Sequence, residues 1–258
     1  MPTLPAALLY AELEASSAAL AALVDSADPG LPIPSCPGWT LRQLTTHVGR
    51  AHRWAAEIVR TRSAEFIEFR SVPDGRLPDD PAESGRWLTA GATWLIDALK
   101  DAGEQGVWTP AGMSPAGFWG RRMAHETIVH CADAQLAIGD EPEIPAELAA
   151  DAIDEWLTVM SGPIFGGPDP RAAALPHGRA LHVHVADPDL SGAKAWRVVH
   201  TDAGVQVQVP EGSGDVALAG PSADVLLVLL GRMPATAEAV RVFGDSDVLE
   251  AWLKGTSF

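Results

Sequence analysis

Two side chains that commonly bind metal ions, Glu126 and His130, lie four positions apart in the stretch RRMAHETIVHCADAQLAIG, residues 121–139. The stretch has no proline and no glycine before Gly139, so we expect one long helix that ends there. In a helix, residues four positions apart lie about 40° apart on adjacent turns, so both can reach one divalent cation. His125 is five positions before His130, about 140° around the helix, and is not expected to join the pair.

The Glu126–His130 pair also has a simpler interpretation, a weak interaction on a solvated helix surface. Ala134 and Ala137 lie on the same helix face, which indicates that the face looks inward, where a carboxylate and an imidazole need partners. Asp133 follows one turn beyond His130 and could orient its imidazole. The spacing differs from the H-E-x-x-H pattern of zinc proteases, in which two histidines are four positions apart. This stretch alone leaves the choice open, and a third ligand from another segment would decide it.

Four other segments have the apolar spacing of helices, and long helices joined by loops predict a helical bundle, whose interior commonly holds metal ligands. They are residues 4–24, 40–58, 81–100 and 145–160. Thr40 begins the second with Gln43 three positions later, the pattern of a capping box. His47 and His52 lie on opposite edges of the apolar stripe of that helix. Either could be a histidine at the edge of the core that is paired with a carbonyl.

The second half of the chain changes its periodicity. Residues 163–178 are rich in glycine and proline and have the composition of a linker. Three later stretches, RALHVHVAD, AKAWRVVHTD and GVQVQVP, alternate apolar and polar residues and predict antiparallel strands. Residues 222–231 predict an apolar helix capped by Ser222, and residues 245–254 a closing helix. We therefore expect a helical bundle over residues 1–162, a linker over 163–178 and a small α+β domain over 179–258.

Composition limits the classes of function. The formal charge is −16 and the sequence pI is near 4.7, so the surface would repel nucleic acid. We find no run of eighteen or more apolar residues and expect no membrane span. The first residues lack the basic segment of a signal peptide, and the two cysteines are too few for a disulfide scaffold. These observations predict a soluble cytoplasmic protein, and we expect a monomer or a homodimer.

Three segments together resemble the mycothiol-dependent maleylpyruvate isomerase-like family of the DinB superfamily. They are PSCPGWTLRQLTTH at residues 34–47, HETIVH at 125–130 and SADVLLVLLGR at 222–232. The turn before a helical histidine, combined with the later Glu-x-x-x-His, is specific, although each half alone is weak. The resemblance covers nearly the whole chain. It implies a DinB-type four-helix metal-binding bundle followed by a small α+β domain similar to sterol carrier proteins, with a small antiparallel sheet.

The resemblance also implies a set of functional residues. The metal ligands of the family correspond to His47, Glu126 and His130, which leave coordination positions open for water or a thiol. Zinc is the expected cation, although Ni²⁺ or Fe²⁺ would also accept these ligands. Arg232 matches a family position that is thought to face the active site, where it could hold a substrate carboxylate. Its alternative role is that of a cation at a helix C-terminus.

The implied activity is thiol chemistry on a small molecule. The family uses mycothiol as cosubstrate, and coordination to the metal would lower the pKa of the thiol. We therefore expect a maleylpyruvate cis–trans isomerase or a thiol S-transferase. Two alternatives are a lipid-binding protein with a structural metal and a metal-dependent hydrolase of thiol conjugates. Cys36 and Cys131 are expected to be structural rather than catalytic.

Overall fold

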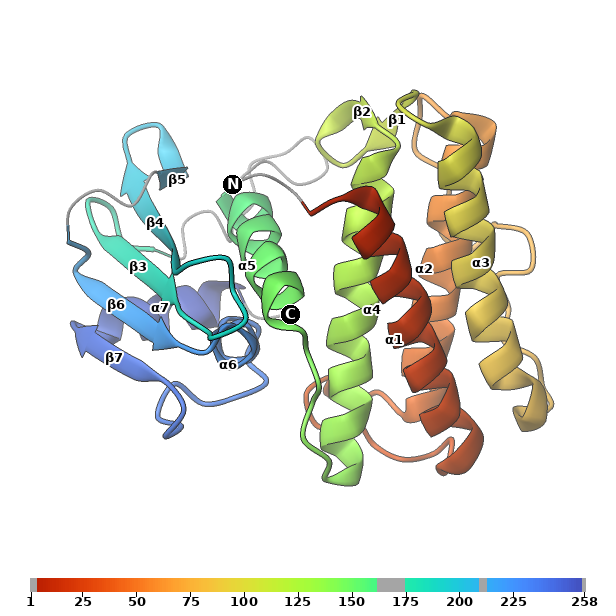
Figure 1. Ribbon diagram of the computed structural model, residues 1–258, viewed down its shortest axis with the longest axis horizontal. Helices are drawn as coiled ribbons and strands as arrows, with labels where there is room; N and C mark the ends of the chain where they lie inside the picture. Colours follow the sequence, from red (N-terminus) through yellow and green to blue (C-terminus); the bar gives the residue numbers. More distant parts are fainter. Residues whose placement is uncertain (1–3, 162–174, 209–212, 257–258) are drawn as a thin grey trace. The chain divides into compact units, whose positions relative to one another are not determined.

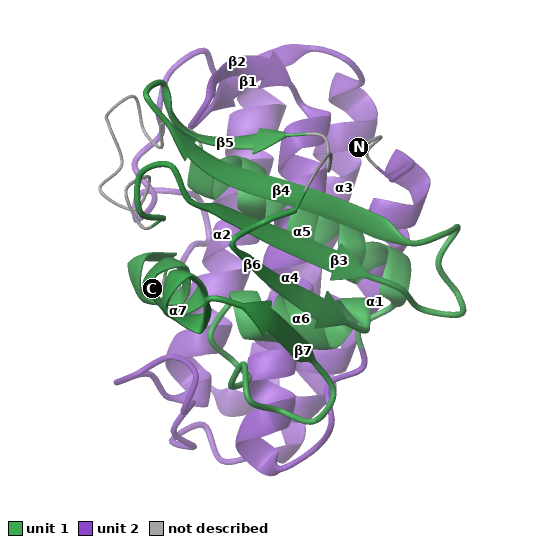
Figure 2. Ribbon diagram, turned by 90° about the vertical axis from the view of Figure 1, so that its left-hand side faces the viewer, with its two compact units in different colours: residues 1–3, 144–258 green, residues 4–143 purple. Residues whose placement is uncertain are grey.

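The computed structural model describes residues 4–161, 175–208 and 213–256, which form two compact units (Figure 2). We call residues 4–143 the bundle unit and residues 144–258 the sheet unit. The fold class predicted from the sequence, a helical bundle followed by an α+β region, is confirmed.

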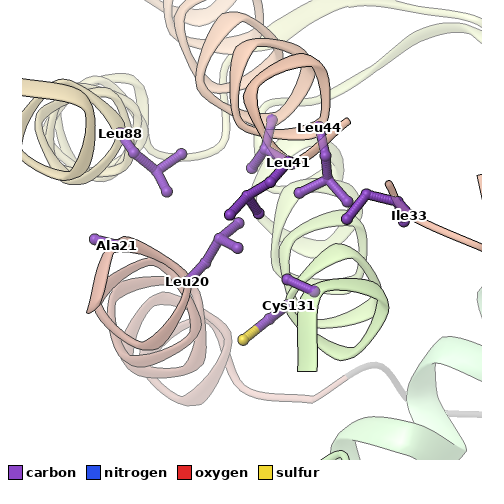
Figure 3. Close-up of a cluster of buried hydrophobic side chains, with 9 residues drawn as sticks. Leu20, Ala21, Ile33, Leu41, Leu44, Leu88 and Cys131 are labelled. Carbon is purple, nitrogen blue, oxygen red and sulfur yellow. The ribbon is translucent and has the colours of Figure 1, made fainter. Parts of the chain in front are cut away.

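Four long helices build the bundle unit (Figure 1). They are α1 (Ala6–Ser26), α2 (Leu41–Thr61), α3 (Ser84–Ala102) and α4 (Gly117–Ile138), and a 3-10 turn, η1 (Pro81–Glu83), precedes α3. α1 packs against α3 and α4, and α2 packs against the same two helices. Figure 3 shows part of their shared core, in which Leu20, Leu44, Leu88 and Cys131 come from the four different helices.

The predicted ends of two helices are confirmed. The Thr40 hydroxyl accepts a hydrogen bond from the Gln43 backbone N–H, and the Gln43 side chain accepts one from the Thr40 N–H at 2.8 Å. This capping box fixes the start of α2. Gly139 follows α4 with φ of 84°, a left-handed conformation that glycine adopts without strain.

The segment before α4 has more structure than the glycines and prolines of its sequence predict. Strands β1 (Gly106–Thr109) and β2 (Gly112–Pro115) form an antiparallel hairpin, and α4 begins at Gly117 rather than at residue 121. Trp119 explains the earlier start, because its ring is buried and its indole N–H donates to the Trp108 carbonyl at 2.9 Å.

The first helix has the length and composition of a membrane-spanning segment, which we did not expect from the sequence. This is weak evidence, because core helices and signal sequences have the same properties. In the structure α1 packs against α3 and α4 and buries Leu9, Leu13 and Leu20. Because 33% of the apolar stretch is buried, the core of the bundle accounts for part of its apolar surface.

A five-stranded sheet forms the centre of the sheet unit, in the order β5-β4-β3-β6-β7 (Figure 2). The strands are β3 (Ala180–Val185), β4 (Lys194–Thr201), β5 (Gly204–Gln208), β6 (Val216–Gly220) and β7 (Arg241–Gly244), and the helices are α5 (Ala146–Ser161), α6 (Ser222–Leu229) and α7 (Ser246–Thr256). The sheet is antiparallel as predicted except between β3 and β6, which run parallel. Ser222 is the first residue of α6 rather than its cap, and its hydroxyl donates to the Ala146 carbonyl at 3.1 Å.

Helix α5 belongs to the sheet unit, whereas the sequence-based boundary after residue 162 assigned it to the bundle. Its polar contacts explain the difference. Asp154 accepts a hydrogen bond from the Trp196 indole at 2.9 Å, and Glu147 pairs with Lys194 of β4. The predicted linker lies mostly on residues 162–174, which are outside the described part of the chain, and stays a prediction.

Candidate metal centre

Three side chains from two helices of the bundle unit converge. The His47 Nε2 atom of α2 lies 2.8 Å from the Glu126 Oε1 atom of α4, and the His130 Nε2 atom lies 3.4 Å from the same oxygen. One donor atom of each residue lies within 4.8 Å of the other two. The two imidazole rings stand nearly perpendicular, at 80°, with their centres 5.1 Å apart.

The packing of α2 against α4 positions these groups. His47 lies three positions after Leu44 and directly before Val48, and both of these residues are fully buried. Helix α2 is therefore held with one edge toward α4. Glu126 and His130 occupy successive turns of α4 and present their polar atoms to that edge. Their side chains are 24% and 11% exposed, so the site is largely shielded but can still be reached from solvent.

Neighbouring side chains hold two of the three groups in orientation. Arg122 Nη2 donates to the second oxygen of Glu126 at 3.0 Å, which leaves Oε1 for the histidines. The fully buried Asp133 accepts a hydrogen bond from His130 Nδ1 at 2.8 Å. Because Asp133 accepts from Nδ1, Nε2 is the nitrogen that faces Glu126, and it carries the lone pair whenever the ring is neutral, as it is in a metal ligand.

The charges of the two α4 residues reinforce each other. Burial alone would raise the pKa of Glu126, but hydrogen bonds from His130 and His47 hold that pKa well below its usual value. Burial alone would lower the pKa of His130, but hydrogen bonds to Asp133 and Cys36 hold that pKa well above its usual value. Glu126 is therefore an ionised carboxylate next to a basic imidazole.

The donor set fits a divalent cation. Two imidazole nitrogens and one carboxylate oxygen form a ligand set typical of catalytic zinc, and three protein ligands leave a position open. Asp133 behind His130 is the carboxylate–histidine arrangement found around such metals. These side chains could hold a metal ion without a change in the packing of the two helices.

The structure places the other two bundle histidines away from this group. His52, the alternative to His47 on α2, is fully buried, and its Nε2 atom lies 2.8 Å from the Thr127 hydroxyl. Burial lowers the pKa of His52 to about 4. His125 is also buried but does not belong to the convergent set. Of the two histidines that the sequence left open, His47 is the one brought to Glu126 and His130.

The two cysteines differ in their surroundings. Cys131 is buried in the bundle core, and burial raises the pKa of its thiol to about 11. Cys36 is half-buried, and its Sγ atom lies 3.5 Å from Asp133 Oδ2. No spacing pattern indicates an acidic neighbour for Cys36, because Asp133 lies 97 positions away in the chain.

Arg232 lies in the sheet unit, just beyond the end of α6. Its Nη1 atom donates to the Leu230 carbonyl at 2.7 Å, which is the contact expected of a cation at a helix C-terminus. Binding of a substrate carboxylate by Arg232 stays a prediction.

Two aromatic side chains next to the site were not predicted. The Trp39 ring centre lies 5.0 Å from that of His47 and 6.1 Å from that of His130. The Phe69 ring centre lies 6.2 Å from that of His47. Both belong to loops, where no periodicity indicates the direction of a side chain. Arg122 was also missed, although its spacing of four positions from Glu126 could have identified it.

Comparison with known proteins extends these observations. Residues 10–135 match the family model described as the mycothiol maleylpyruvate isomerase N-terminal domain, and residues 147–251 match the MDMPI C-terminal domain. A search of curated proteins found no match.

Two solved structures share the fold. The crystal structure of the mycothiol-dependent maleylpyruvate isomerase superposes with a TM-score of 0.61 at 15% sequence identity, covering 94% of this chain and 95% of that chain. A histidine-to-alanine mutant of the mycothiol-dependent maleylpyruvate isomerase gives 0.60 at the same identity and coverage. With both family models matched over most of its length, the chain belongs to the mycothiol-dependent maleylpyruvate isomerase-like family.

Proposed function

We propose that this protein is a divalent-metal-dependent enzyme that uses mycothiol to attack an electrophilic small molecule. The reaction is that of a maleylpyruvate-type cis–trans isomerase or of a thiol S-transferase. The observation that carries the proposal is the convergence of His47, Glu126 and His130 within the bundle unit. Family membership supports the choice of thiol.

Each residue of the site has a defined task in this proposal. His47 Nε2, Glu126 Oε1 and His130 Nε2 would hold the cation, which we expect to be zinc, with Ni²⁺ or Fe²⁺ as alternatives. When bound, such a cation lowers the pKa of a coordinated thiol, so that thiolate is present at neutral pH. Asp133 keeps the His130 proton on Nδ1, and Arg122 keeps Glu126 ionised and turned toward the histidines.

The two reaction types share their first step. The thiolate sulfur bonds to one carbon of a cis double bond, and the π electron pair moves to the adjacent carbon. The former double bond is then a single bond that can rotate. When that electron pair returns, the same thiolate leaves, so the double bond is restored in the trans configuration and the cosubstrate is regenerated. In an S-transferase the new carbon–sulfur bond persists, and the adjacent carbon takes up a proton. We also propose that Arg232 binds a substrate carboxylate. The enzyme is expected to act in the cytoplasm.

The proposal is tested by turnover of maleylpyruvate with and without added mycothiol, using protein purified without a metal-affinity tag. We expect fumarylpyruvate or a stable thioether to form only when both metal and thiol are present. Release of free thiol from a conjugate, with no need for added thiol, would instead identify a hydrolase. Binding of a lipid-like ligand without any metal-dependent turnover would contradict the proposal.

A further inference from the structure

A pocket of about 360 Å³ adjoins the candidate metal centre within the bundle unit. Its wall on α2 carries Gln43, Thr46, His47 and Arg50. The loop aromatics Trp39 and Phe69 and the exposed Arg70 line the rest. Residues three positions apart in a helix are neighbours on its surface, so Arg50 lies one turn from the proposed metal ligand His47. A molecule in this pocket would therefore contact both residues.

Arg50 differs from three other buried or half-buried arginines of the bundle unit. Arg42, Arg53 and Arg122 are each at least partly buried, and each lies within 4.0 Å of a carboxylate oxygen. No aspartate or glutamate in the described part of the chain pairs with the half-buried Arg50. In a protein of charge −16, a half-buried guanidinium with no protein carboxylate at its side indicates an anionic ligand.

The guanidinium of Arg50 is held in place for such a ligand. Its Nε atom donates to the Gly75 carbonyl at 2.9 Å, and its central carbon lies 5.8 Å from the centre of the Phe69 ring. These contacts fix the plane of the group, and among the residues that the structure describes no carboxylate or carbonyl takes up its two terminal nitrogens. Trp39, whose ring centre lies 5.0 Å from that of His47, offers a flat apolar surface suited to a planar carbon skeleton.

We propose that Arg50 is a specificity-determining residue of this pocket, where its guanidinium binds a carboxylate of the electrophilic substrate and so holds the reacting double bond beside His47. The inference rests on the proposed function, because it assumes that the attacking thiol is delivered next to His47. It adds a specificity-determining residue in the bundle unit to the proposed metal ligands.

The test measures binding of maleate, a small cis-unsaturated dicarboxylate, to the metal-loaded full-length protein by isothermal titration calorimetry. We expect Arg50→Gln to weaken maleate binding at least tenfold, because a charged hydrogen-bonded pair is lost. Arg50→Lys should show an intermediate loss, since it keeps the charge but not the two-pronged geometry. Dimethyl maleate, which has the same shape without charge, should bind at least tenfold more weakly than maleate.

The matched control is Arg60→Gln, which removes one positive charge from the same helix at an exposed position paired with Glu57. It should change maleate binding by less than about twofold. Thermal unfolding verifies that each variant is folded, and Arg50→Lys carries the test if Arg50→Gln does not fold. Maleate binding that is undetectable in the wild type, or unchanged in Arg50→Gln, would overturn the inference.

Metal content, measured on the same samples, separates this inference from the proposed function. Arg50-dependent maleate binding by a protein that retains no metal would leave the inference standing and contradict the proposed function. Normal metal content and thiol-dependent turnover, with maleate binding that does not require Arg50, would refute the inference alone. This second result is the one expected if maleate binds directly to the metal ion rather than to Arg50.

Discussion

Asp133 determines which nitrogen of His130 faces the candidate metal centre. It is fully buried and accepts a hydrogen bond from His130 Nδ1 at 2.8 Å. Replacement by asparagine removes the charge and allows the amide to donate instead, so the imidazole loses both its orientation and its basicity. We expect Asp133→Asn to weaken zinc affinity by about ten- to a hundredfold, as measured by competition with a chelator.

Asp97→Asn, an exposed substitution on α3, is the control for this change and should leave zinc affinity unaltered. Equal affinity in Asp133→Asn and the wild type would show that Asp133 does not position His130.

His52 makes stability depend on pH, because burial lowers its pKa from 6.5 to about 4. The unfolded chain takes up a proton at His52 below about pH 6.5, whereas the folded chain does so only near pH 4. Its contribution to stability is therefore complete above pH 6.5 and is lost as the pH falls toward 4. Between pH 7 and pH 5 the loss is about 2 kcal/mol.

Urea unfolding of the wild type and of His52→Gln at both pH values measures this effect. The difference between the two proteins should shrink by that amount at pH 5, because the variant lacks the titrating group. A constant difference across the range would contradict a neutral buried His52.

The residues of the candidate centre differed in how far the sequence could identify them. Glu126 and His130 follow from helical spacing, which fixes their relative position within one element. His47 and His52 could not be separated by periodicity, and a family resemblance selected His47. Arg50 lay within a predicted helix, but its pocket depends on Trp39 and Phe69. How closely these two side chains approach His47 depends on the conformation of their loops, which no spacing pattern in the sequence predicts.

At the scale of elements, the close approach of α2 and α3 depends on Gly49. A Cβ atom at this position would lie 2.1 Å from the Trp87 ring, so the two helices could not pack as they do. We expect Gly49→Ala to destabilise the protein by about 1–3 kcal/mol, even though alanine is the better helix former. Chemical denaturation measures the change.

Gly117→Ala provides the comparison, because a Cβ at this first residue of α4 meets nothing within 4 Å. It should leave stability unchanged or raise it slightly. If the two substitutions had the same effect, the contact between Gly49 and Trp87 would not limit the approach of the helices.

Helices that depend on local signals were predicted well, and arrangements that depend on distant contacts were not. The Thr40 capping box and the end of α4 at Gly139 depend only on residues close together in the sequence, and both predictions are confirmed. The parallel pairing of β3 and β6 was not predicted. Alternation of apolar and polar residues predicts a strand, but not its neighbour or its direction. The assignment of α5 to the sheet unit likewise depends on contacts such as Asp154 with Trp196, 42 positions apart.

For the whole molecule, the two-part organisation and the family were both predicted, and the family models confirm the family. The candidate metal centre and the Arg50 pocket lie entirely within the bundle unit. Under these proposals, the bundle unit binds the metal and one substrate carboxylate, and Arg232 of the sheet unit also binds a substrate carboxylate.

The central claim is that His47, Glu126 and His130 hold one cation, and elemental analysis of untagged protein tests it most directly. We expect about one divalent metal ion per wild-type chain and almost none in His47→Ala or His130→Ala. The folded controls His52→Gln and His125→Ala should retain the metal, since neither histidine belongs to the convergent set. Metal retained in His47→Ala, or lost equally in His125→Ala, would contradict the account.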